Sequence, residues 1–213
     1  MIGGLTPFTT IDFPGRLAAV LFCQGCPWRC GYCHNPHLQP RNGGTIMAWE
    51  TVMAFVRKRR GLLDGIVFSG GEPLWQRALG GAMRALKEEG FAVALHTGGG
   101  NADRMRAVLP HTDWVGFDFK APFASYEKIA GVDAGTQART ALLALIESGV
   151  EYEIRTTVDA ALSLADLYHM ADQLAQLGIS HWVLQKRRGG ATHGVESFMA
   201  LQRAHGIHIE WRA

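Results

Sequence analysis

The chain has 213 residues, which fits one domain of ordinary size, and its formal net charge at pH 7 is only +2. This charge excludes a strongly basic protein, so we expect no binding to nucleic acid or to an anionic membrane. Hydrophobic residues make up 47% of the chain, which excludes a disordered protein. No apolar run approaches the roughly 18 residues that span a bilayer. The run Leu17–Cys23, which follows Arg16, is short for a signal peptide, and no charged segment opens the chain. We therefore expect a cytoplasmic protein.

Apolar, strand-like runs alternate with amphipathic, helix-like stretches almost to the C-terminus. Several of the helix-like stretches are followed by glycine, which commonly ends helices. This alternation predicts an α/β fold with a parallel sheet. The expected strands are Ala18–Cys23, Gly65–Ser69, Phe91–Thr97, Trp114–Lys120, Glu151–Val158, Ile179–Gln185 and a short last one at Ile207–Trp211. The expected helices are Ala48–Arg60, Gln76–Glu89, Ala102–Leu109, Thr136–Ser148, Leu164–Leu177 and Val195–His205.

Six βα units are fewer than the eight of a closed barrel. An open partial (β/α)6 TIM-like barrel and a doubly wound sheet both fit this number, and both place ligands at the carboxyl ends of the parallel strands. Residues with functional chemistry do lie at or just after the ends of the first four expected strands: the cysteines, then Gly70–Pro73, then Thr97–Gly100, then Asp118 and Lys120. We expect the open barrel, as a single domain over residues 1–213.

All four cysteines, Cys23, Cys26, Cys30 and Cys33, fall within eleven residues. Disulfide bonds between them would close only very short loops, so a secreted disulfide scaffold is excluded. Structural zinc sites usually separate their cysteine pairs by a dozen or more residues, whereas only three separate these pairs. Iron-sulfur clusters take closely spaced cysteines from one looping segment. The spacing favours an iron-sulfur cluster, with zinc as the alternative.

The four cysteines are not expected to share one role. Cys23 ends the apolar run Val20–Cys23, where a buried thiol behaves as a small hydrophobic side chain. Cys26, Cys30 and Cys33 then remain as metal ligands. Three ligands on a four-iron cluster leave one iron open, which is typical of a catalytic site.

The segment Cys26–Cys33, with the sequence CPWRCGYC, resembles the C-x3-C-x-aromatic-C signature of radical S-adenosylmethionine (SAM) enzymes. Gly70–Pro73, directly after an expected strand, resembles the second motif of that family, which holds the methionine amino group. Paired glycines also let a ligand reach the backbone, and Glu72 offers a carboxylate to an ammonium group. The alternative for this second motif is a plain turn with a surface glutamate.

The resemblance implies one 4Fe-4S cluster and SAM as cofactors, with the open iron chelated by the amino and carboxylate groups of SAM. It implies a cluster loop at residues 24–44, after an N-terminal extension at residues 1–17. No cysteine is left for an auxiliary cluster. The implied ligands are Cys26, Cys30 and Cys33, the implied SAM-binding residues include Gly70, Gly71 and Glu72, and Tyr32 would lie beside the adenine.

Charged residues end the next expected strands. Asp118 and Lys120 share a face and resemble the Asp-x-Lys of glycyl-radical-enzyme activating enzymes, in which the pair contacts the methionine and ribose of SAM. Arg155 and Thr157 share a face of the fifth expected strand, where Arg155 is a candidate to hold a carboxylate. An ion pair that only serves the structure is the alternative in both cases.

Two further segments lie at strand ends. His96–Gly99 occupies the place where these activating enzymes carry Asp-Thr-Asn-Gly, so Thr97 and the glycine turn match while histidine replaces the aspartate. A carboxylate contact from this strand is therefore not expected. The basic loop Lys186–Gly190 follows the sixth expected strand and is a candidate docking segment for a partner.

The beginning of the chain extends the resemblance to activating enzymes of glycyl-radical enzymes, most similar to those of anaerobic ribonucleoside-triphosphate reductases. The matching segments are Gly4–Phe8, Thr10–Gly15, Phe22–Cys26 and Cys33–Pro36. The resemblance implies reductive cleavage of SAM to a 5′-deoxyadenosyl radical, which removes a hydrogen atom from a glycine of the partner enzyme. It also implies a low-potential electron donor such as flavodoxin or ferredoxin. The alternatives are a small-molecule radical SAM enzyme, similar to 7-carboxy-7-deazaguanine synthase, and a non-enzymatic iron-sulfur or zinc module.

Overall fold

The computed structural model describes residues 2–42, 46–187 and 195–212. They form one eight-stranded sheet whose strands follow chain order from β1 to β8. β1 pairs antiparallel with β2, and the pairings from β2 to β8 are parallel. The strands are Ile2–Thr9 (β1), Ala18–Cys23 (β2), Gly65–Gly70 (β3), Ala92–Thr97 (β4), Trp114–Asp118 (β5), Glu151–Val158 (β6), His181–Lys186 (β7) and His208–Arg212 (β8).

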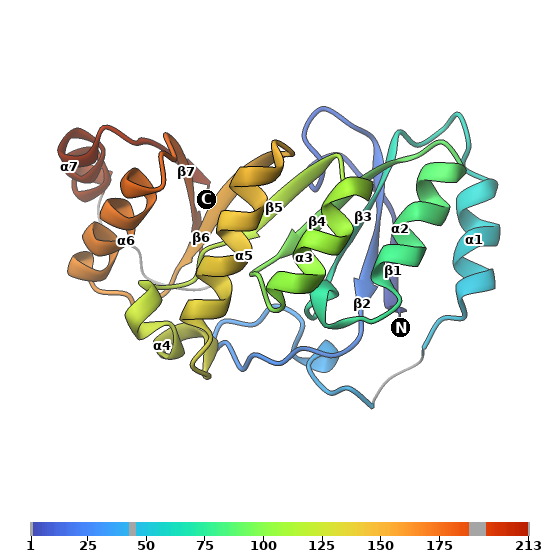
Figure 1. Cartoon of the computed structure of the whole chain (residues 1–213), viewed down its shortest axis with the longest axis horizontal. Coiled ribbons are helices and arrows are strands. Elements are labelled where there is room, and N and C mark those ends of the chain that lie inside the picture. The colour runs from blue at the N-terminus through green and yellow to red at the C-terminus, as the bar shows by residue number, and fades with distance from the viewer. Residues whose placement is uncertain (1, 43–45, 188–194, 213) are drawn as a thin grey trace.

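The helices line up along one face of this sheet (Figure 1). When parallel strands follow one another in chain order, right-handed crossovers place every helix on the same side of the sheet. A doubly wound sheet reverses its strand order and carries helices on both sides. The expectation of an open partial barrel is therefore confirmed, with β1 and β8 as its two edges. The helices are Trp49–Arg57 (α1), Leu79–Glu88 (α2), Ala102–Val108 (α3), Glu127–Ala130 (α4), Gly135–Ser148 (α5), Leu164–Gln176 (α6) and Val195–His205 (α7), with 3-10 turns at Pro36–Leu38, Pro73–Trp75, Leu109–His111 and Phe123–Ser125.

The expected strands and helices lie within a few residues of the observed ones, and the main difference is at the N-terminus. Residues 1–17 were expected as an extension, but Ile2–Thr9 forms the edge strand β1. Two glycines and Pro7 weaken the strand signal of this segment. The structure tolerates Pro7 because β1 is an edge strand and its pairing with β2 is irregular between Thr6 and Thr9. The short helix α4 was also not expected, and the fourth expected strand, Trp114–Lys120, ends at Asp118 as β5.

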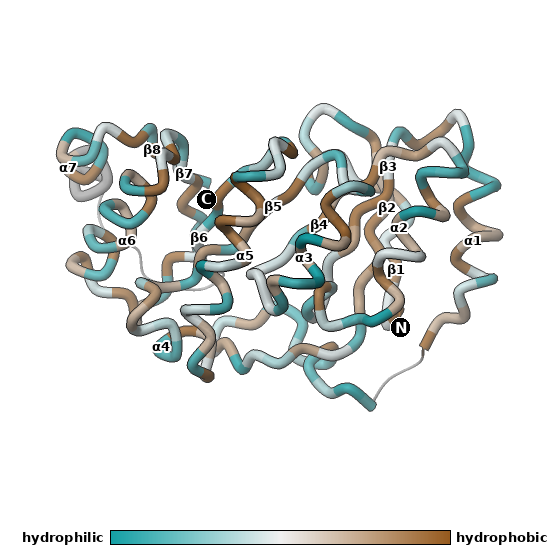
Figure 2. Tube along the Cα trace, in the orientation of Figure 1, coloured by the Kyte–Doolittle hydropathy of each residue, from teal (hydrophilic) through white to brown (hydrophobic). Residues whose placement is uncertain are grey.

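Apolar residues concentrate along the central strands (Figure 2), and they pack on both faces of the sheet. The larger core lies between the sheet and the helices. A smaller core lies on the inner face, where Phe13 from the loop after β1 stacks on Trp114 with ring centroids 6.2 Å apart. A Cβ atom at Gly65 would lie 2.9 Å from the Phe13 ring, so glycine makes room for it. Phe13 thus closes the inner face near the amino ends of the strands, away from the carboxyl ends.

Among the described residues, no helix is long and apolar enough to cross a membrane.

Candidate active site

A cavity of about 290 Å³ lies between the carboxyl ends of β3 to β7 and the loop that follows β2. Parallel strands present their carboxyl ends at the same edge of the sheet, which is where this fold binds ligands. The structure brings every predicted site residue to this cavity. The predicted residues that line it are Cys26, Cys30, Tyr32, Cys33, Gly70, Gly71, Glu72, Thr97, Asp118, Lys120 and Arg155.

The loop after β2 is held by its own backbone hydrogen bonds. Gly25 N donates to Leu38 O over 2.7 Å and Cys26 N donates to Gln39 O over 3.0 Å. These bonds tie the start of the loop to its later part. Cys26 is buried. Cys26, Cys30 and Cys33 are all free of disulfide bonds. The loop therefore presents three free thiols to one cavity.

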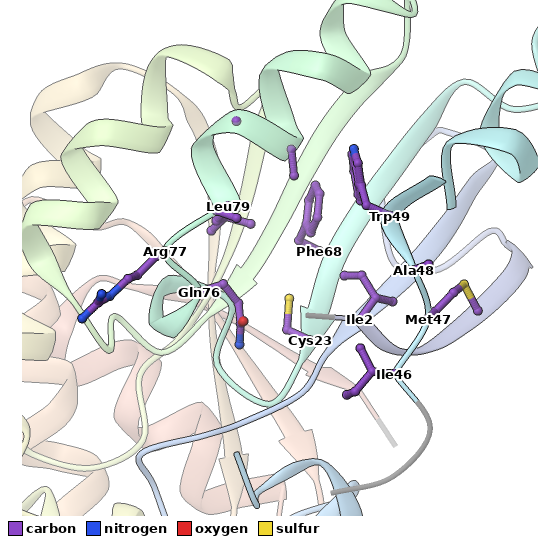
Figure 3. Close-up of a pocket in the computed structure, with 13 residues that line it drawn as sticks. Ile2, Cys23, Ile46, Met47, Ala48, Trp49, Phe68, Gln76, Arg77 and Leu79 are labelled. Atoms are coloured by element: carbon purple, nitrogen blue, oxygen red, sulfur yellow. The ribbon is translucent and has the colours of Figure 1, made fainter. Parts of the chain in front are cut away.

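Cys23 lies elsewhere, as its apolar surroundings in the sequence predicted. Its side chain is 1% exposed and lines a second cavity, between α1 and α2 (Figure 3). Burial raises the pKa of the Cys23 thiol to about 12, so it stays neutral at physiological pH. The interpretation of Cys23 as a packing residue agrees with this position.

The three cavity thiols fit an iron-sulfur cluster. Burial raises the pKa of Cys26 to about 12 and raises that of Cys30 above its usual value, so metal binding must displace their protons. Within the described ranges, no three His, Cys, Asp or Glu side chains form a group that could hold one metal ion. A four-iron cluster takes each thiolate on a different iron, so its ligands need to line a common cavity and not to meet at one point.

The two glycines of the second motif allow a close backbone contact. Gly70 has φ +104°, and a Cβ atom on it would lie 2.5 Å from Cys23 N. A Cβ atom on Gly71 would lie 2.3 Å from Gly25 O. Gly71 N donates to Cys23 O over 2.9 Å, and Glu72 N donates to Gly25 O over 3.0 Å. The glycines thus make room for the cysteine loop, and their predicted contact with a ligand stays a prediction.

Glu72 is 1% exposed, so the alternative of a surface glutamate is wrong. Its Oε1 accepts hydrogen bonds from Leu74 N (2.9 Å) and Thr97 Oγ1 (2.5 Å), and its Oε2 accepts one from Gly98 N (3.1 Å). A carboxylate has about four acceptor positions, which leaves one on Oε2. Burial raises the pKa of Glu72, while these hydrogen bonds and Lys120 act against the rise. A cation in the cavity would therefore favour its charged form.

Lys120 places a positive charge beside the cysteine loop. Its side chain is largely buried, and its Nζ lies 5.0 Å from the Trp28 ring centroid and 5.9 Å from that of Tyr32. Both distances are within the range of cation–π attraction. Burial alone would lower the pKa of Lys120, but nearby acidic groups, with Tyr32 and Asp118 first, raise it well above its usual value. Lys120 is thus charged at neutral pH.

Asp118 faces two cations, which confirms that Asp118 and Lys120 share a face. Arg155 donates to Asp118 Oδ1 from Nη2 (2.9 Å) and Nε (3.2 Å), and Lys120 Nζ lies 3.6 Å from Asp118 Oδ2. Burial would raise the pKa of Asp118, but Arg155 and Lys120 outweigh it and lower that pKa. The ion pair weighed as the alternative is therefore present. Because two cations share one carboxylate, positive charge remains for an anionic group in the cavity.

His96 and Asp12 also line the cavity and were not predicted as site residues. His96 Nε2 lies 2.8 Å from Asp12 O, and the ring packs edge-on against Trp114. Burial and the charge of Arg155 lower the pKa of His96 to about 4, so the ring is neutral and Nε2 donates this bond. Its place beside Thr97 at a strand end was a usable signal. Nothing in the sequence showed that the segment around Asp12 returns to the strand ends.

The basic loop proposed as a docking segment lies only partly within the described residues. Lys186 ends β7, and Arg187 Nη1 donates to Asp159 Oδ2 over 2.7 Å. Residues 188–190 of the predicted loop lie outside the described residues. Its docking role stays a prediction.

A sequence model described as the Radical SAM superfamily matches residues 20–181 of the chain. A Methanocaldococcus jannaschii protein, named for the activation of glycyl-radical enzymes, is 30% identical over 167 residues, which cover 74% of this chain and 68% of that protein. The pyruvate formate-lyase-activating enzyme of Clostridium pasteurianum is 36% identical over 115 residues, which cover 52% of this chain and 48% of that enzyme. The chain thus spans about half the length of the second relative.

Among solved structures, QueE from Escherichia coli is similar with a TM-score of 0.64 and 18% sequence identity. The match covers 100% of this chain and 93% of that chain. At this identity the likeness shows the fold alone. It agrees with the single α/β domain and the mostly parallel, open sheet described above.

Proposed function

The chain belongs to the radical SAM superfamily, and from this premise we propose that it is an activating enzyme that generates a glycyl radical on a partner enzyme. The observation that carries the proposal is the single cavity onto which three free thiols, the buried Glu72 carboxylate and the Asp118–Lys120–Arg155 group all open. The two sequence relatives are both named as activating enzymes of this kind. Their similarity supports the activity, and the cavity supplies a site for it.

A 4Fe-4S cluster and SAM are the cofactors of this superfamily. We assign Cys26, Cys30 and Cys33 as the cluster ligands, because they are the cysteines that line the cavity. When bound and reduced, the cluster with SAM supplies a one-electron cleavage that yields methionine and a 5′-deoxyadenosyl radical, and the radical removes a hydrogen atom from a glycine of the partner.

The residues around the cavity have complementary charges for the methionine end of SAM. The remaining acceptor position on Glu72 Oε2 suits an ammonium group, and Thr97 and Gly98 hold that carboxylate in place. The positive charge left around Asp118 suits the SAM carboxylate, for which Arg155 is the candidate partner. Glu72 is thus assigned to the ammonium group and Arg155 to the carboxylate.

The aromatic residues of the cysteine loop suit the adenosine end. The Tyr32 ring is half-buried, lines the cavity and lies over the Lys120 ammonium, so one side of the cavity has both an apolar surface and a fixed charge. We assign Tyr32 to the adenine and the Asp118–Lys120 pair to the ribose and methionine. Water exclusion by Trp28, which is buried beside Lys120, would protect a reactive radical from side reactions.

We further propose an anaerobic ribonucleoside-triphosphate reductase as the partner, reduced flavodoxin or ferredoxin as the electron source, and the open edge of the barrel as the entry for the glycine segment. What supports the partner is the sequence Thr10–Gly15. In the structure this segment inserts Phe13 into the inner core and places Asp12 at the cavity. A macromolecular substrate needs a site that reaches the surface, and the sheet is not closed between β8 and β1.

Electron paramagnetic resonance tests this function. The protein, loaded anaerobically with iron and sulfide and reduced with dithionite, is mixed with SAM and an anaerobic ribonucleoside-triphosphate reductase. We expect a glycyl-radical doublet together with 5′-deoxyadenosine, and neither with Cys30→Ala. SAM cleavage without a doublet would contradict the assigned partner, and turnover of a small molecule in its place would favour the small-molecule radical enzyme. A loaded cluster that cleaves no SAM would contradict the activity itself.

A further inference from the structure

A groove on the outer side of the cysteine loop is not used by the proposed reaction. It has a volume of about 700 Å³ and lies between the beginnings of α1 and α2 (Figure 3). None of the residues that line it also lines the active-site cavity. Its lining is mainly apolar and includes Ile2, Cys23, Ile46, Met47, Trp49 and Leu79.

A basic hollow adjoins this apolar groove. The hollow has a volume of about 250 Å³, shares Arg77 with the groove, and is also lined by Arg41 and Trp75. The Arg41 guanidinium lies 5.1 Å from the centre of the Trp75 ring. Arg104 adds a third guanidinium next to Trp75, because its Nη1 donates to Leu74 O over 2.5 Å. We call the groove and the hollow together the outer surface.

The positive charges of the outer surface are not neutralised by the chain. Arg41 and Arg77 are exposed, and within the part of the chain that the structure describes neither forms an ion pair. An apolar centre bordered by unpaired cations has the composition of a protein interface, and its charge fits an acidic partner.

The outer surface lies directly behind the cysteine loop. Trp75 packs on the backbone of Gly25, where an added Cβ atom would lie 3.4 Å from the Trp75 ring. Gly25 directly precedes Cys26, the first assigned cluster ligand. Gln76 Nε2 donates to Gln24 O over 2.7 Å, which ties the same segments together a second time. A redox group that rests on Trp75 is therefore separated from Cys26 by the thickness of one residue.

We propose that the outer surface is the docking site of an acidic one-electron donor protein. The inference rests on the proposed function, which needs one electron for each SAM cleaved. In this step the donor protein loses one electron and the cluster gains it, changing from its 2+ to its 1+ state, and no bond forms or breaks. Docking behind the loop leaves the active-site cavity free for the glycine segment of the partner enzyme, because the two sites share no lining residue.

The test compares the doubly substituted Arg41→Glu/Arg77→Glu protein with the wild type and with Arg139→Glu. Arg139 is exposed on α5, which is separated from α2 by α3 (Figure 1), so its substitution changes the charge away from the outer surface. The probe is an acidic flavodoxin. Calorimetric titration gives its Kd for each cluster-loaded protein, and stopped-flow absorbance gives the rate at which the reduced flavodoxin reduces the cluster.

We expect the double variant to bind flavodoxin at least about tenfold more weakly than the wild type and to be reduced correspondingly more slowly, with Arg139→Glu unchanged. Added salt should weaken wild-type binding more than binding of the double variant, because the steering charges are gone. Dithionite, a small reductant that needs no docking, should reduce all three proteins equally. Arg41→Gln/Arg77→Gln should give an intermediate Kd, which separates loss of charge from misfolding.

Equal Kd values for the wild type and the double variant, or no binding of flavodoxin to the wild type, would overturn the docking site. A double substitution that changed the mass of the protein in sedimentation, while leaving flavodoxin binding intact, would assign the surface to a second copy of the chain and also overturn it. Failure of the proposed function is distinguishable. In that case the dithionite-reduced wild type cleaves no SAM, whereas failure of the docking site alone leaves that cleavage intact.

Discussion

Replacing Phe13 by alanine should destabilise the fold strongly. The Phe13 side chain is 3% exposed and stacks on Trp114, and with Ala18 and Val20 it fills the inner face of the sheet. Truncation of a buried phenylalanine to alanine costs about 3–5 kcal/mol, from lost burial and from the cavity left behind. Gly65, which lies against the Phe13 ring, has no side chain that could fill the space left behind.

Phe8→Ala is the matched control, since Phe8 lies five residues earlier and is 56% exposed. Its free energy of unfolding should stay within about 1 kcal/mol of the wild type. Urea unfolding followed by circular dichroism measures both variants. At an m-value of about 2 kcal/mol per molar urea, a loss of 4 kcal/mol lowers the midpoint by about 2 M. A loss below about 1 kcal/mol for Phe13→Ala, or equal losses for both variants, would refute the view that Thr10–Gly15 closes the inner core.

Three further predictions concern the cysteine loop, the half-buried His96 and the beginning of α6. Gly71→Ala should hold much less iron after anaerobic reconstitution, because its methyl group would lie 2.3 Å from a carbonyl oxygen of the cysteine loop. The control Gly81→Ala, whose methyl group has open space around it, should hold as much iron as the wild type. Equal iron contents in the two variants would contradict this reasoning. The wild type should lose up to about 3 kcal/mol of stability from pH 7 to pH 4, because the pKa of His96 is near 6.5 in the unfolded state and about 4 in the folded state. In urea denaturation across this range, the free energy of unfolding of His96→Gln should depend less steeply on pH. Asp166→Asn, which breaks a capping box and an ion pair to Lys128, should cost about 1 kcal/mol by thermal unfolding at pH 7. Because the pKa of Asp166 is lowered in the fold, that difference should shrink as the pH falls below 3.8, and a constant difference would contradict the mechanism.

The architecture was predictable from the sequence because its signals are local. Strands buried on both faces read as continuous apolar runs, as Ala18–Cys23 does, and the helices between them show amphipathic periodicity that ends at glycines. β1 was missed because its glycines and Pro7 break the strand pattern. What makes Ile2–Thr9 a strand is its pairing with β2, which is a tertiary contact.

The location of the site was also predictable, because parallel strands bring their carboxyl ends to one edge. That rule alone joins Glu72, Asp118 and Arg155 to the cysteine loop. Asp12 was missed because its position depends on the insertion of Phe13 into the inner core. A local sequence pattern does not reveal such an insertion.

The detailed use of predicted residues was harder to foresee. Glu72 was expected to await a ligand, but most of its acceptor positions hold neighbouring donors of the chain. The close approach of the cysteine loop to Gly70 and Gly71 was also not foreseen. These contacts require that segments far apart in the sequence be placed relative to one another to within a few tenths of an ångström. Residue type alone did not indicate this placement.

We propose that Cys26, Cys30 and Cys33 hold a cluster with one open iron, while Cys23 only packs. The most direct measurement is the iron content of four single Cys→Ala proteins after anaerobic reconstitution, with the electron paramagnetic resonance spectrum of each reduced protein recorded before and after SAM is added. The wild type and Cys23→Ala should hold about four irons per chain and change their spectra with SAM. The other three variants should lose the cluster or the spectral change. A cluster that survives each of those three substitutions but is lost in Cys23→Ala, or a wild-type spectrum that ignores SAM, would contradict the account.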